Sequence, residues 1–208
     1  MHGHRRRWRS AGLLSALVIG AIQLVSAPAV AAPPTTAAAA RILYYDASRA
    51  AEFVSVVHQG ANNWNAALSN VQLRPVPAGV RANITVIADN GWPRAQTTSL
   101  GNGRWYMGRQ AVRDGHYTPR ISTHEFGHLL GLPDRRTGRC TDLMSGASAG
   151  TSCRNPLPNA AEAAEANANF APRAAVSTKA AARSYTWEGS GTSVDQSALS
   201  PVGAPARS

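Results

Sequence analysis

The chain has 208 residues, a formal net charge of +10, two cysteines and 44% hydrophobic residues. Much of the excess basic charge lies near the N-terminus, because residues 42–171 hold 12 arginines, no lysine and nine acidic residues, a net charge of +3. That charge is small and scattered, which excludes a basic stripe for binding nucleic acid and predicts an ordinary protein surface.

Residues 1–32 have the three parts of a secretory signal peptide. A basic run at residues 5–9 precedes an uncharged apolar stretch at 11–25, and small residues from Ala27 to Ala32 offer cleavage sites. The apolar stretch is too short and wrongly flanked for a membrane anchor. We therefore expect general export and a secreted, extracellular protein, with an uncleaved anchor or twin-arginine export as alternatives. Residues 33–41 lack apolar periodicity and are predicted to be a short pro-segment or linker.

A strand, a long helix and a second strand are predicted next. Residues 42–45 are β-branched and aromatic, which favours a strand. Apolar residues recur at three- and four-residue spacing over residues 49–68, which predicts an amphipathic helix whose middle is weakened by Gly60. Residues 71–76 alternate in polarity and are predicted to form a strand that Pro75 confines or ends.

Two more strands and a second helix follow. Residues 82–88 form the most apolar strand pattern of the chain, which suggests an inner, buried position in a sheet. Residues 104–107 form a short pattern of mixed polarity between glycines, which suits a sheet edge. Thr118 and Pro119 can begin the helix that comes next, with proline at its first position.

That helix carries the motif H-E-x-x-H-x-x-G-x-x-D, which begins at His124. His124 and His128 lie one turn apart on one helix face, where their imidazoles can bind one zinc ion. Glu125 can hold and deprotonate a water. Gly131 can adopt a positive φ that turns the chain back, so that Asp134 can supply a third ligand. Three protein ligands leave a fourth position open, which is the catalytic pattern. An amphipathic core helix with two incidental histidines would not explain Glu125.

Cys140 and Cys153 are the only cysteines and both follow the predicted zinc helix. In a secreted protein such a pair is expected to form a disulfide bond. Zinc ligation by the two thiolates is the weaker alternative, because their spacing fits no zinc finger.

A final helix is predicted within residues 157–170, and the chain beyond it is of low complexity. Four apolar residues could pack this helix below the active site: Ala161, Ala164, Ala168 and Phe170. Residues 172–208 have few large apolar side chains and are expected to be a disordered tail, with processing or a small binding appendage as alternatives. Tyr185 and Trp187 are the exceptions and could dock.

Together these motifs resemble the snapalysin family, small secreted neutral metalloproteases of Streptomyces in which an aspartate replaces the third histidine of most metzincins. The resemblance covers about residues 42–171 and also rests on Gly-Leu-Pro-Asp at 131–134, Cys-Thr-Asp-Leu-Met-Ser-Gly at 140–146, and Ser-Cys-Arg-Asn-Pro at 152–156 followed by Pro-Asn-Ala at 158–160. It implies an α+β, metzincin-like zincin fold with a small twisted mixed sheet, a long backing helix, the zinc-binding active-site helix and a C-terminal helix.

The resemblance also implies roles for single residues. It implies one catalytic zinc ion on the three ligands and Met144 in a turn beneath them, where a plain core methionine would look the same in sequence. The strand pattern at 103–109 becomes the candidate edge for pairing with the substrate main chain, although an ordinary edge hairpin is equally compatible. Where the family has a tyrosine two residues after the aspartate ligand, this chain has Arg136, whose guanidinium could stabilise an oxyanion or point to solvent. The family's acidic calcium ligand is replaced in the stretch 117–119, which leaves calcium open.

The sequence thus predicts a secreted zinc-dependent endopeptidase that cleaves extracellular proteins. The resemblance adds a preference for an aromatic residue after the scissile bond. Expected partners are protein or peptide substrates and, as a further candidate, a secreted protease inhibitor; neither nucleic acid nor membrane is expected, and the protein should be a monomer. The alternatives are a catalytically impaired zinc-binding module and another zinc hydrolase, such as a deacetylase of cell-wall sugars.

Overall fold

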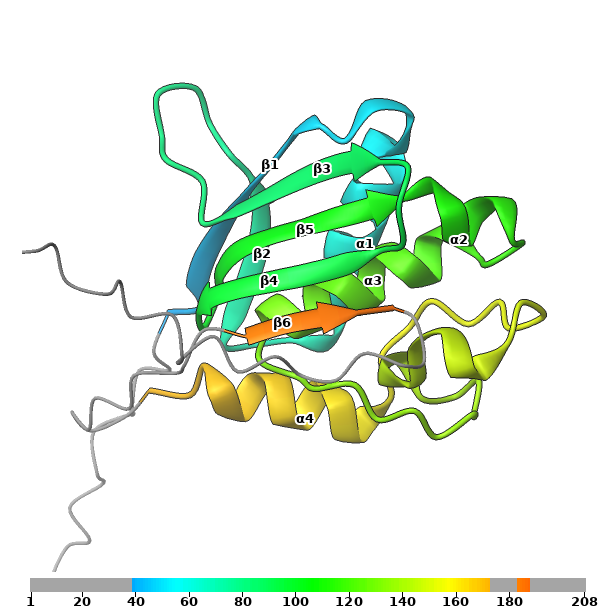
Figure 1. Cartoon of the computed structure of the whole chain (residues 1–208). Coiled ribbons are helices and arrows are strands. Elements are labelled where there is room, and N and C mark those ends of the chain that lie inside the picture. Colours follow the sequence, from blue (N-terminus) through cyan, green and yellow to red (C-terminus); the bar gives the residue numbers. More distant parts are fainter. Residues whose placement is uncertain (1–38, 173–182, 188–208) are drawn as a thin grey trace, which may run out of the picture. The chain divides into compact units, whose positions relative to one another are not determined.

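The computed structural model describes residues 39–172 and 183–187 (Figure 1). The predicted signal peptide and residues 33–38 lie outside the described residues. Among the residues that are described, no helix combines the length and apolar character needed to cross a membrane.

A mixed β-sheet of six strands forms one layer of the fold, in the order β2-β1-β3-β5-β4-β6. The strands are β1 (Arg41–Arg49), β2 (Val71–Pro75), β3 (Ile84–Asp89), β4 (Arg94–Ser99), β5 (Asn102–Gly108) and β6 (Arg183–Thr186). The strands β2, β1, β3 and β5 are parallel to their neighbours, whereas β4 is antiparallel to β5 and β6 is antiparallel to β4. The predicted mixed sheet is confirmed, with β3 in the inner position that its apolar pattern indicated.

The helices α1 (Val54–Ala67) and α3 (Thr118–Leu129) cover one face of this sheet (Figure 1). The other helical segments of the described residues are the 3-10 helix η1 (Ala51–Phe53), α2 (Arg109–Arg113), the 3-10 segment η2 (Leu143–Ala149) and α4 (Ala160–Asn169). The helix predicted over residues 49–68 is confirmed in its main part, but its first turn is the tighter η1. The helix α3 begins where predicted, with Pro119 in its first turn.

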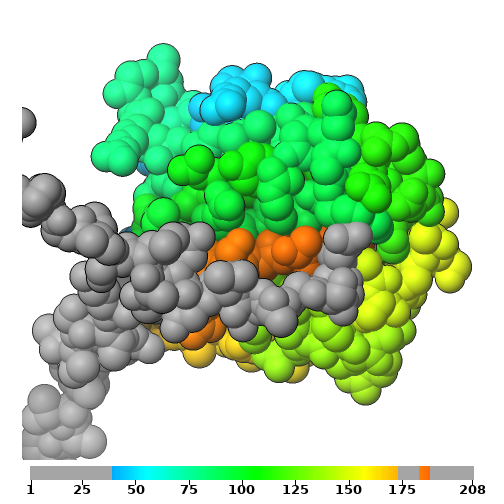
Figure 2. All heavy atoms as spheres, viewed as in Figure 1, coloured from blue at the N-terminus to red at the C-terminus, as the bar shows by residue number. Residues whose placement is uncertain are grey.

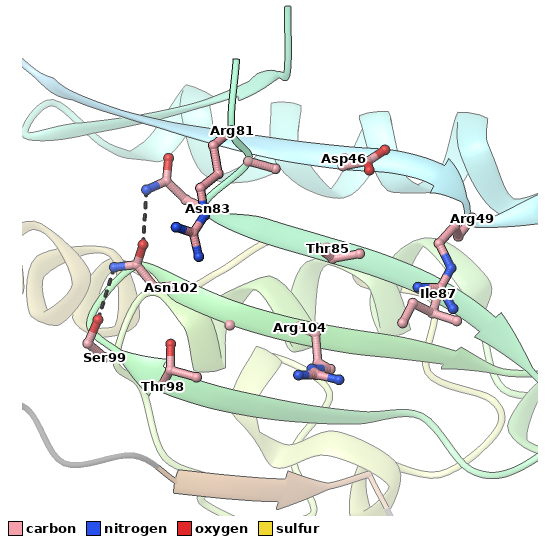
Figure 3. Close-up of a pocket in the computed structure, with 12 residues that line it drawn as sticks. Asp46, Arg49, Arg81, Asn83, Thr85, Ile87, Thr98, Ser99, Asn102 and Arg104 are labelled. Atoms are coloured by element: carbon pink, nitrogen blue, oxygen red, sulfur yellow. Dashed lines mark hydrogen bonds between the residues drawn. The ribbon is translucent and has the colours of Figure 1, made fainter. Parts of the chain in front are cut away.

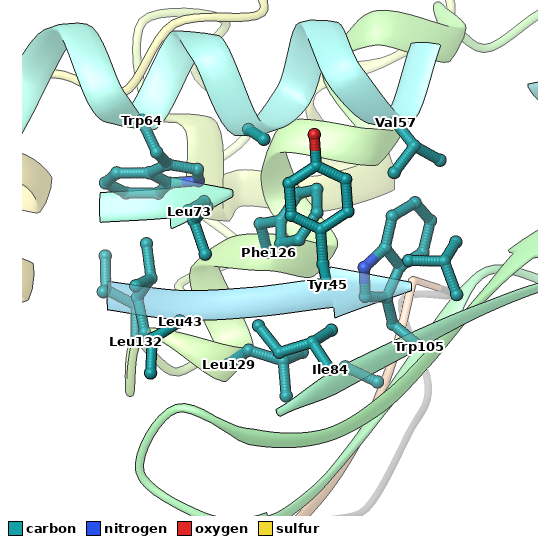
Figure 4. Packing of buried hydrophobic residues seen from close by; sticks show 14 of the residues in the cluster. Leu43, Tyr45, Val57, Trp64, Leu73, Ile84, Trp105, Phe126, Leu129 and Leu132 are labelled. Carbon is teal, nitrogen blue, oxygen red and sulfur yellow. The ribbon is translucent and has the colours of Figure 1, made fainter. Parts of the chain in front are cut away.

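The core lies between the sheet and the helices α1 and α3 (Figure 4). Phe126 of α3 makes edge-to-face contacts with Tyr45 of β1, at 5.5 Å between ring centroids, and with Trp105 of β5, at 5.3 Å. Trp64 of α1 is fully buried and donates a hydrogen bond of 2.7 Å from its indole nitrogen to the carbonyl oxygen of Thr123. Aromatic packing and this buried hydrogen bond fix α3 against both layers.

Gly60 lies where α1 and α3 approach each other most closely. A Cβ atom added there would lie 2.3 Å from the Oγ atom of Ser122. The glycine that weakens α1 in isolation is thus the residue that lets the two helices meet.

The edge-strand prediction was wrong. The pattern at 104–107 became β5, which lies between β3 and β4 and has no free edge, so residues 103–109 do not form the edge proposed for substrate. The strand that covers it, β4, was not predicted, because Arg-Ala-Gln-Thr-Thr-Ser contains one small apolar residue, Ala95, as its only buried member. A strand near the rim of a sheet needs little apolar surface, so periodicity gives a weak signal there.

The buried face of α4 differs from the prediction except at Phe170, which packs in the core as predicted. Ala161, Ala164 and Ala168 are exposed, and the inward residues are Glu162, Ala166 and Phe170. Asn159 and Glu162 form a capping box, and the Glu162 carboxylate also accepts hydrogen bonds from the backbone N–H groups of Leu143 and Met144. The hydrogen bonds of the buried Glu162 therefore fix the orientation of α4, because its alanine side chains are too small and too similar to favour one face.

Part of the tail that was expected to be disordered is ordered. The strand β6 pairs with β4, and the next residue, Trp187, extends this pairing by a hydrogen bond to Pro93. Tyr185 and Trp187, the two aromatic residues of this tail, both pack against the domain. Trp187 is almost completely buried, with 1% of its surface exposed.

Candidate metal centre and catalytic site

The helix α3 is buried along nearly its whole length and presents the motif histidines to one point. The Nε2 atoms of His124 and His128 lie 3.1 Å apart, and their rings are nearly perpendicular. Each Nδ1 atom faces a backbone carbonyl, that of Leu143 at 3.1 Å and that of Leu132 at 2.9 Å. A carbonyl can only accept, so Nδ1 carries the proton and the Nε2 lone pairs point at the shared site. Burial, together with the neighbouring His124, lowers the pKa of His128 to about 3, which keeps this ring neutral.

Asp134 reaches the same point after the chain turns at Gly131. Gly131 has a φ of +94°. The Oδ1 atom of Asp134 lies 3.3 Å from the Nε2 atom of His124 and 3.7 Å from that of His128. Burial acts to raise the pKa of Asp134, but the two histidines and Arg136 together hold it below its ordinary value. The structure therefore brings together the three predicted ligands.

This three-residue group fits a metal ion. For ligand bonds of about 2.0–2.1 Å, tetrahedral geometry requires ligand atoms about 3.3 Å apart, and the three atoms are separated by 3.1, 3.3 and 3.7 Å. The Asp134 Oδ1 atom is buried and has no hydrogen-bond partner among the described residues. Two facing imidazole lone pairs and an unpartnered carboxylate oxygen are electrostatically costly without a cation between them.

Glu125 is the second buried acid of the site. It is 0% exposed, and within residues 39–172 and 183–187 neither of its carboxylate oxygens has a hydrogen-bond partner. Burial raises the pKa of Glu125 well above its usual range, with a further contribution from the charge of Asp134. A carboxylate whose pKa is raised in this way is a stronger base than an ordinary glutamate, which suits it to proton transfer.

Met144 and two glycines shape the floor of the site. Met144 is fully buried below α3, and a Cβ atom added to Gly127 would lie 2.6 Å from its sulfur. Gly146 has a φ of +61°, and a Cβ atom there would lie 3.0 Å from the guanidinium of Arg136 and 3.2 Å from the ring of His124. Met144 thus packs against α3 at Gly127, and its role in a turn beneath the ligands stays a prediction.

Sequence reasoning missed Arg120, which was counted among scattered surface arginines. This residue is only 2% exposed. Its guanidinium donates to four carbonyl oxygens of the segment that holds Met144: those of Cys140 (3.1 Å), Asp142 (2.6 Å), Leu143 (3.3 Å) and Asn155 (2.8 Å). Its position one turn before His124, on the same helix face, is the signal that could have identified it.

The predicted disulfide bond between Cys140 and Cys153 is confirmed, with Cα atoms 5.4 Å apart. It closes the loop that contains η2, so the disulfide and Arg120 fasten the same segment. In the entropy model, closing a loop of this size stabilises the fold by about 3 kcal/mol.

Arg136 does not point to solvent. Its guanidinium donates a hydrogen bond of 2.9 Å to the Oδ2 atom of Asp134 and two further bonds to carbonyl oxygens of the C-terminal segment, those of Thr186 and Trp187. Its backbone has a φ of +48°, a conformation that non-glycine residues seldom adopt. This arginine is therefore held in place at the site.

A separate polar pocket of about 910 Å³ lies on the other face of the sheet (Figure 3). Arg49, Arg81, Arg104 and Asp46 contribute its charged side chains. None of the proposed metal ligands lines it, and neither does Glu125.

A buried helix with H-E-x-x-H, completed by a carboxylate and packed under a mixed sheet, is an arrangement typical of metallopeptidases. Residues 40–172 match the family described as Streptomyces extracellular neutral proteinase (M7). The chain is 39% identical over 128 residues to the extracellular small neutral protease of Streptomyces caespitosus, an alignment that covers 61% of this chain and 95% of that protein. It is 37% identical over 138 residues to the protein of the same name from Streptomyces lividans, covering 66% of this chain and 60% of the relative. The chain belongs to this M7 family of neutral proteinases, as the resemblance to snapalysins implied.

Proposed function

We propose that the chain is a secreted zinc-dependent endopeptidase that hydrolyses peptide bonds of extracellular proteins. The observation that carries the proposal is Glu125, a fully buried carboxylate with no hydrogen-bond partner in the described part of the chain, beside a group that fits a metal ion. A purely structural metal site has no use for such a base. Secretion is supported by the signal-like pattern of residues 1–32 and by the relatives, which are named extracellular proteases.

His124, His128 and Asp134 are the residues that would hold the zinc ion. Two imidazole nitrogens and one carboxylate oxygen are a donor set that zinc accepts, with one position left for substrate or water. When bound, the zinc ion would supply a Lewis acid that polarises the scissile carbonyl and makes a water nucleophilic at neutral pH. The hydrogen bonds from the two Nδ1 atoms to the carbonyls of Leu143 and Leu132 orient the rings for this role.

Glu125 moves the protons. In the proposed reaction its carboxylate takes a proton from the water as the water oxygen bonds to the scissile carbonyl carbon. When the carbon–nitrogen bond breaks, Glu125 gives that proton to the leaving amine, so the carboxylate is regenerated in each cycle. The burial that raises its pKa makes the protonated form accessible between the two steps.

The preference for an aromatic residue after the scissile bond comes from the family resemblance. One feature of the site supports it: the indole of Trp187 makes edge-to-face contacts with the rings of His116, at 5.6 Å, and His124, at 4.7 Å. The surface beside the proposed ligands thus accepts an aromatic ring.

The proposal is tested by digesting casein with the full chain and reading each new terminus by mass spectrometry. Glu125→Gln should lower the rate by about 10²- to 10⁴-fold while still binding one zinc ion, measured by elemental analysis. The matched control is Glu52→Gln, because the Glu52 side chain is 52% exposed and pairs with Arg109 away from the site. The control should digest casein at the parental rate.

Two results would argue for other functions. If Glu125→Gln retained the parental rate, the proposed mechanism would be wrong. The other result is a protein that binds one zinc ion and leaves casein intact, even when Tyr185 and Trp187, which contact the histidines, are both replaced by alanine. The catalytically impaired zinc-binding module would then be the better description.

A further inference from the structure

The C-terminal segment 183–187 lies along the outer edge of β4. The strands are antiparallel, with Ala95 opposite Tyr185 and Arg94 opposite Thr186. The backbone N–H of Trp187 continues the ladder with a hydrogen bond of 2.9 Å to the carbonyl oxygen of Pro93. Figure 2 shows this segment, in orange, between the strands above and the segment that carries the third ligand and η2 below. An extended peptide that adds to an open sheet edge in this way is bound mainly through its backbone.

Two aromatic rings of this segment lie on the two histidines of the proposed metal centre. The ring of Tyr185 stacks on that of His128, with centroids 4.0 Å apart and an interplanar angle of 8°. The indole of Trp187 meets the ring of His124 edge to face, with centroids 4.7 Å apart. The segment therefore covers the imidazoles with side chains rather than offering them a peptide carbonyl.

Two main-chain carbonyls of the segment 183–187 are bound by Arg136. The carbonyl oxygens of Thr186 and Trp187 both accept hydrogen bonds from its guanidinium, which also donates to Asp134. The two aromatic rings and the Arg136 hydrogen bonds are different kinds of contact, and both bring the segment to the same site.

We propose that residues 183–187 are an intramolecular inhibitor, a substrate-like strand that occupies the peptide-binding edge β4 and closes the site. This inference rests on the proposed function and adds its regulation. Activation then requires the segment to leave β4, by spontaneous opening, by displacement with substrate or by cleavage of the tail. Because the segment is tethered, its effective concentration at the outer edge of β4 is high even if its intrinsic affinity is low.

The short length of β6 makes this opening accessible. It has four residues and pairs with one strand, so few main-chain hydrogen bonds hold it. Segments of this kind open locally at far lower cost than the whole fold. The fraction of open molecules then sets the apparent activity.

The test uses the full chain with Tyr185→Ala and Trp187→Ala combined, and Arg183→Ala as a control with an exposed side chain in the same strand. Cleavage of a quenched fluorescent peptide should become at least about tenfold faster in the double variant, because two aromatic anchors are lost, and should be unchanged in the control. The free peptide Arg-Ser-Tyr-Thr-Trp should then inhibit the double variant competitively. Equal rates in the parental and double-variant proteins, with no inhibition by the peptide, would overturn the proposal.

A binding assay separates this proposal from the proposed function. Fluorescein-labelled Arg-Ser-Tyr-Thr-Trp should bind the double variant in fluorescence anisotropy and should bind more weakly when Arg136→Ala is added. If neither the parental protein nor the double variant cleaves peptide but this binding is seen, the proposed function fails while the docking of residues 183–187 on β4 is supported. If the peptide does not bind, the inhibitor proposal fails whatever the activity.

A cysteine pair tests the geometry without removing the aromatic anchors. Because the Trp187–Pro93 hydrogen bond sets the register, Gln96 and Ser184 form a non-hydrogen-bonded pair, for which Cα atoms lie about 4.5 Å apart. This spacing permits a disulfide bond. In the full chain, Gln96→Cys with Ser184→Cys should crosslink in air, seen as a mass loss, and should lower cleavage below the parental rate. Failure of the folded double-cysteine protein to crosslink would contradict the docking of β6.

Discussion

Arg120 offers a demanding test of how the site is held, because it touches neither the proposed metal nor any substrate. Its buried guanidinium donates to four carbonyl oxygens between Cys140 and Asn155. One of these acceptors, the carbonyl of Leu143, also receives the Nδ1–H of His124. Arg120 thus acts as a positioning residue for the histidine through one shared carbonyl.

Arg120→Ala should destabilise the protein and weaken metal binding together. Hydrogen bonds from a charged donor contribute about 1.5–3 kcal/mol each when measured singly, but these four share one side chain and are not additive; we expect a loss on the order of 3–5 kcal/mol. Loss of an outer partner of a metal-ligating histidine typically lowers metal affinity about 10- to 100-fold. Arg120→Lys should be intermediate, because an ammonium group keeps the charge but cannot reach four carbonyls from one fixed fork.

The measurements are urea unfolding of the metal-free proteins and zinc affinity by competition with a chelator. Arg154→Ala is the control, since Arg154 also donates to a carbonyl of this loop, that of Thr151 at 2.8 Å, but is exposed. It should change stability by less than about 0.5 kcal/mol. If Arg120→Ala unfolds within about 1 kcal/mol of the parental protein and binds zinc equally well, the argument that this arginine positions His124 is refuted.

Three further predictions concern packing and pH. Gly60→Ala should lower stability despite the higher helix propensity of alanine, because the new methyl group meets Ser122; thermal unfolding measures this, and a rise in midpoint would contradict the close approach. Gly127→Ala should disturb Met144 and reduce zinc affinity in chelator competition; unchanged affinity would show that the floor tolerates displacement. Hydrogen bonds from Thr137 and Arg139 hold the pKa of Asp142 below its ordinary value, so its contribution to stability is present above the unfolded-state pKa and is lost as pH falls below about 4. Asp142→Asn should therefore flatten the fall in stability between about pH 5 and 3; urea unfolding over this range shows whether the slope changes.

The sequence predicted those parts of the site that local spacing determines. His124, His128 and Glu125 belong to one helix, and Asp134 follows one glycine-mediated turn, so the 3.6-residue period and the freedom of Gly131 suffice to bring them together. The pairing of Cys140 with Cys153 required only the absence of any other cysteine.

What sequence could not predict depends on contacts between distant segments. Arg120 looks like any exposed arginine until the loop from 140 to 155 folds over it and supplies carbonyl acceptors. The inward face of α4 is set by the backbone N–H groups of Leu143 and Met144, which lie nearly twenty residues before Glu162 in the chain. The strand β4 has so little apolar surface that only its pairing with β5 and β6 identifies it.

The departure of Arg136 from the family's tyrosine and the presence of β6 have one common explanation. A tyrosine hydroxyl donates a single hydrogen bond, whereas a guanidinium offers five N–H groups in a planar fork. Arg136 uses this capacity to hold Asp134 and two adjacent main-chain carbonyls, those of Thr186 and Trp187, at once. Those carbonyls belong to a segment beyond residue 172, where the match to the family ends. An arginine at this position is therefore suited to a chain whose own strand β6 docks on β4, because only a side chain with several donors can hydrogen-bond to the aspartate and to the docked strand together.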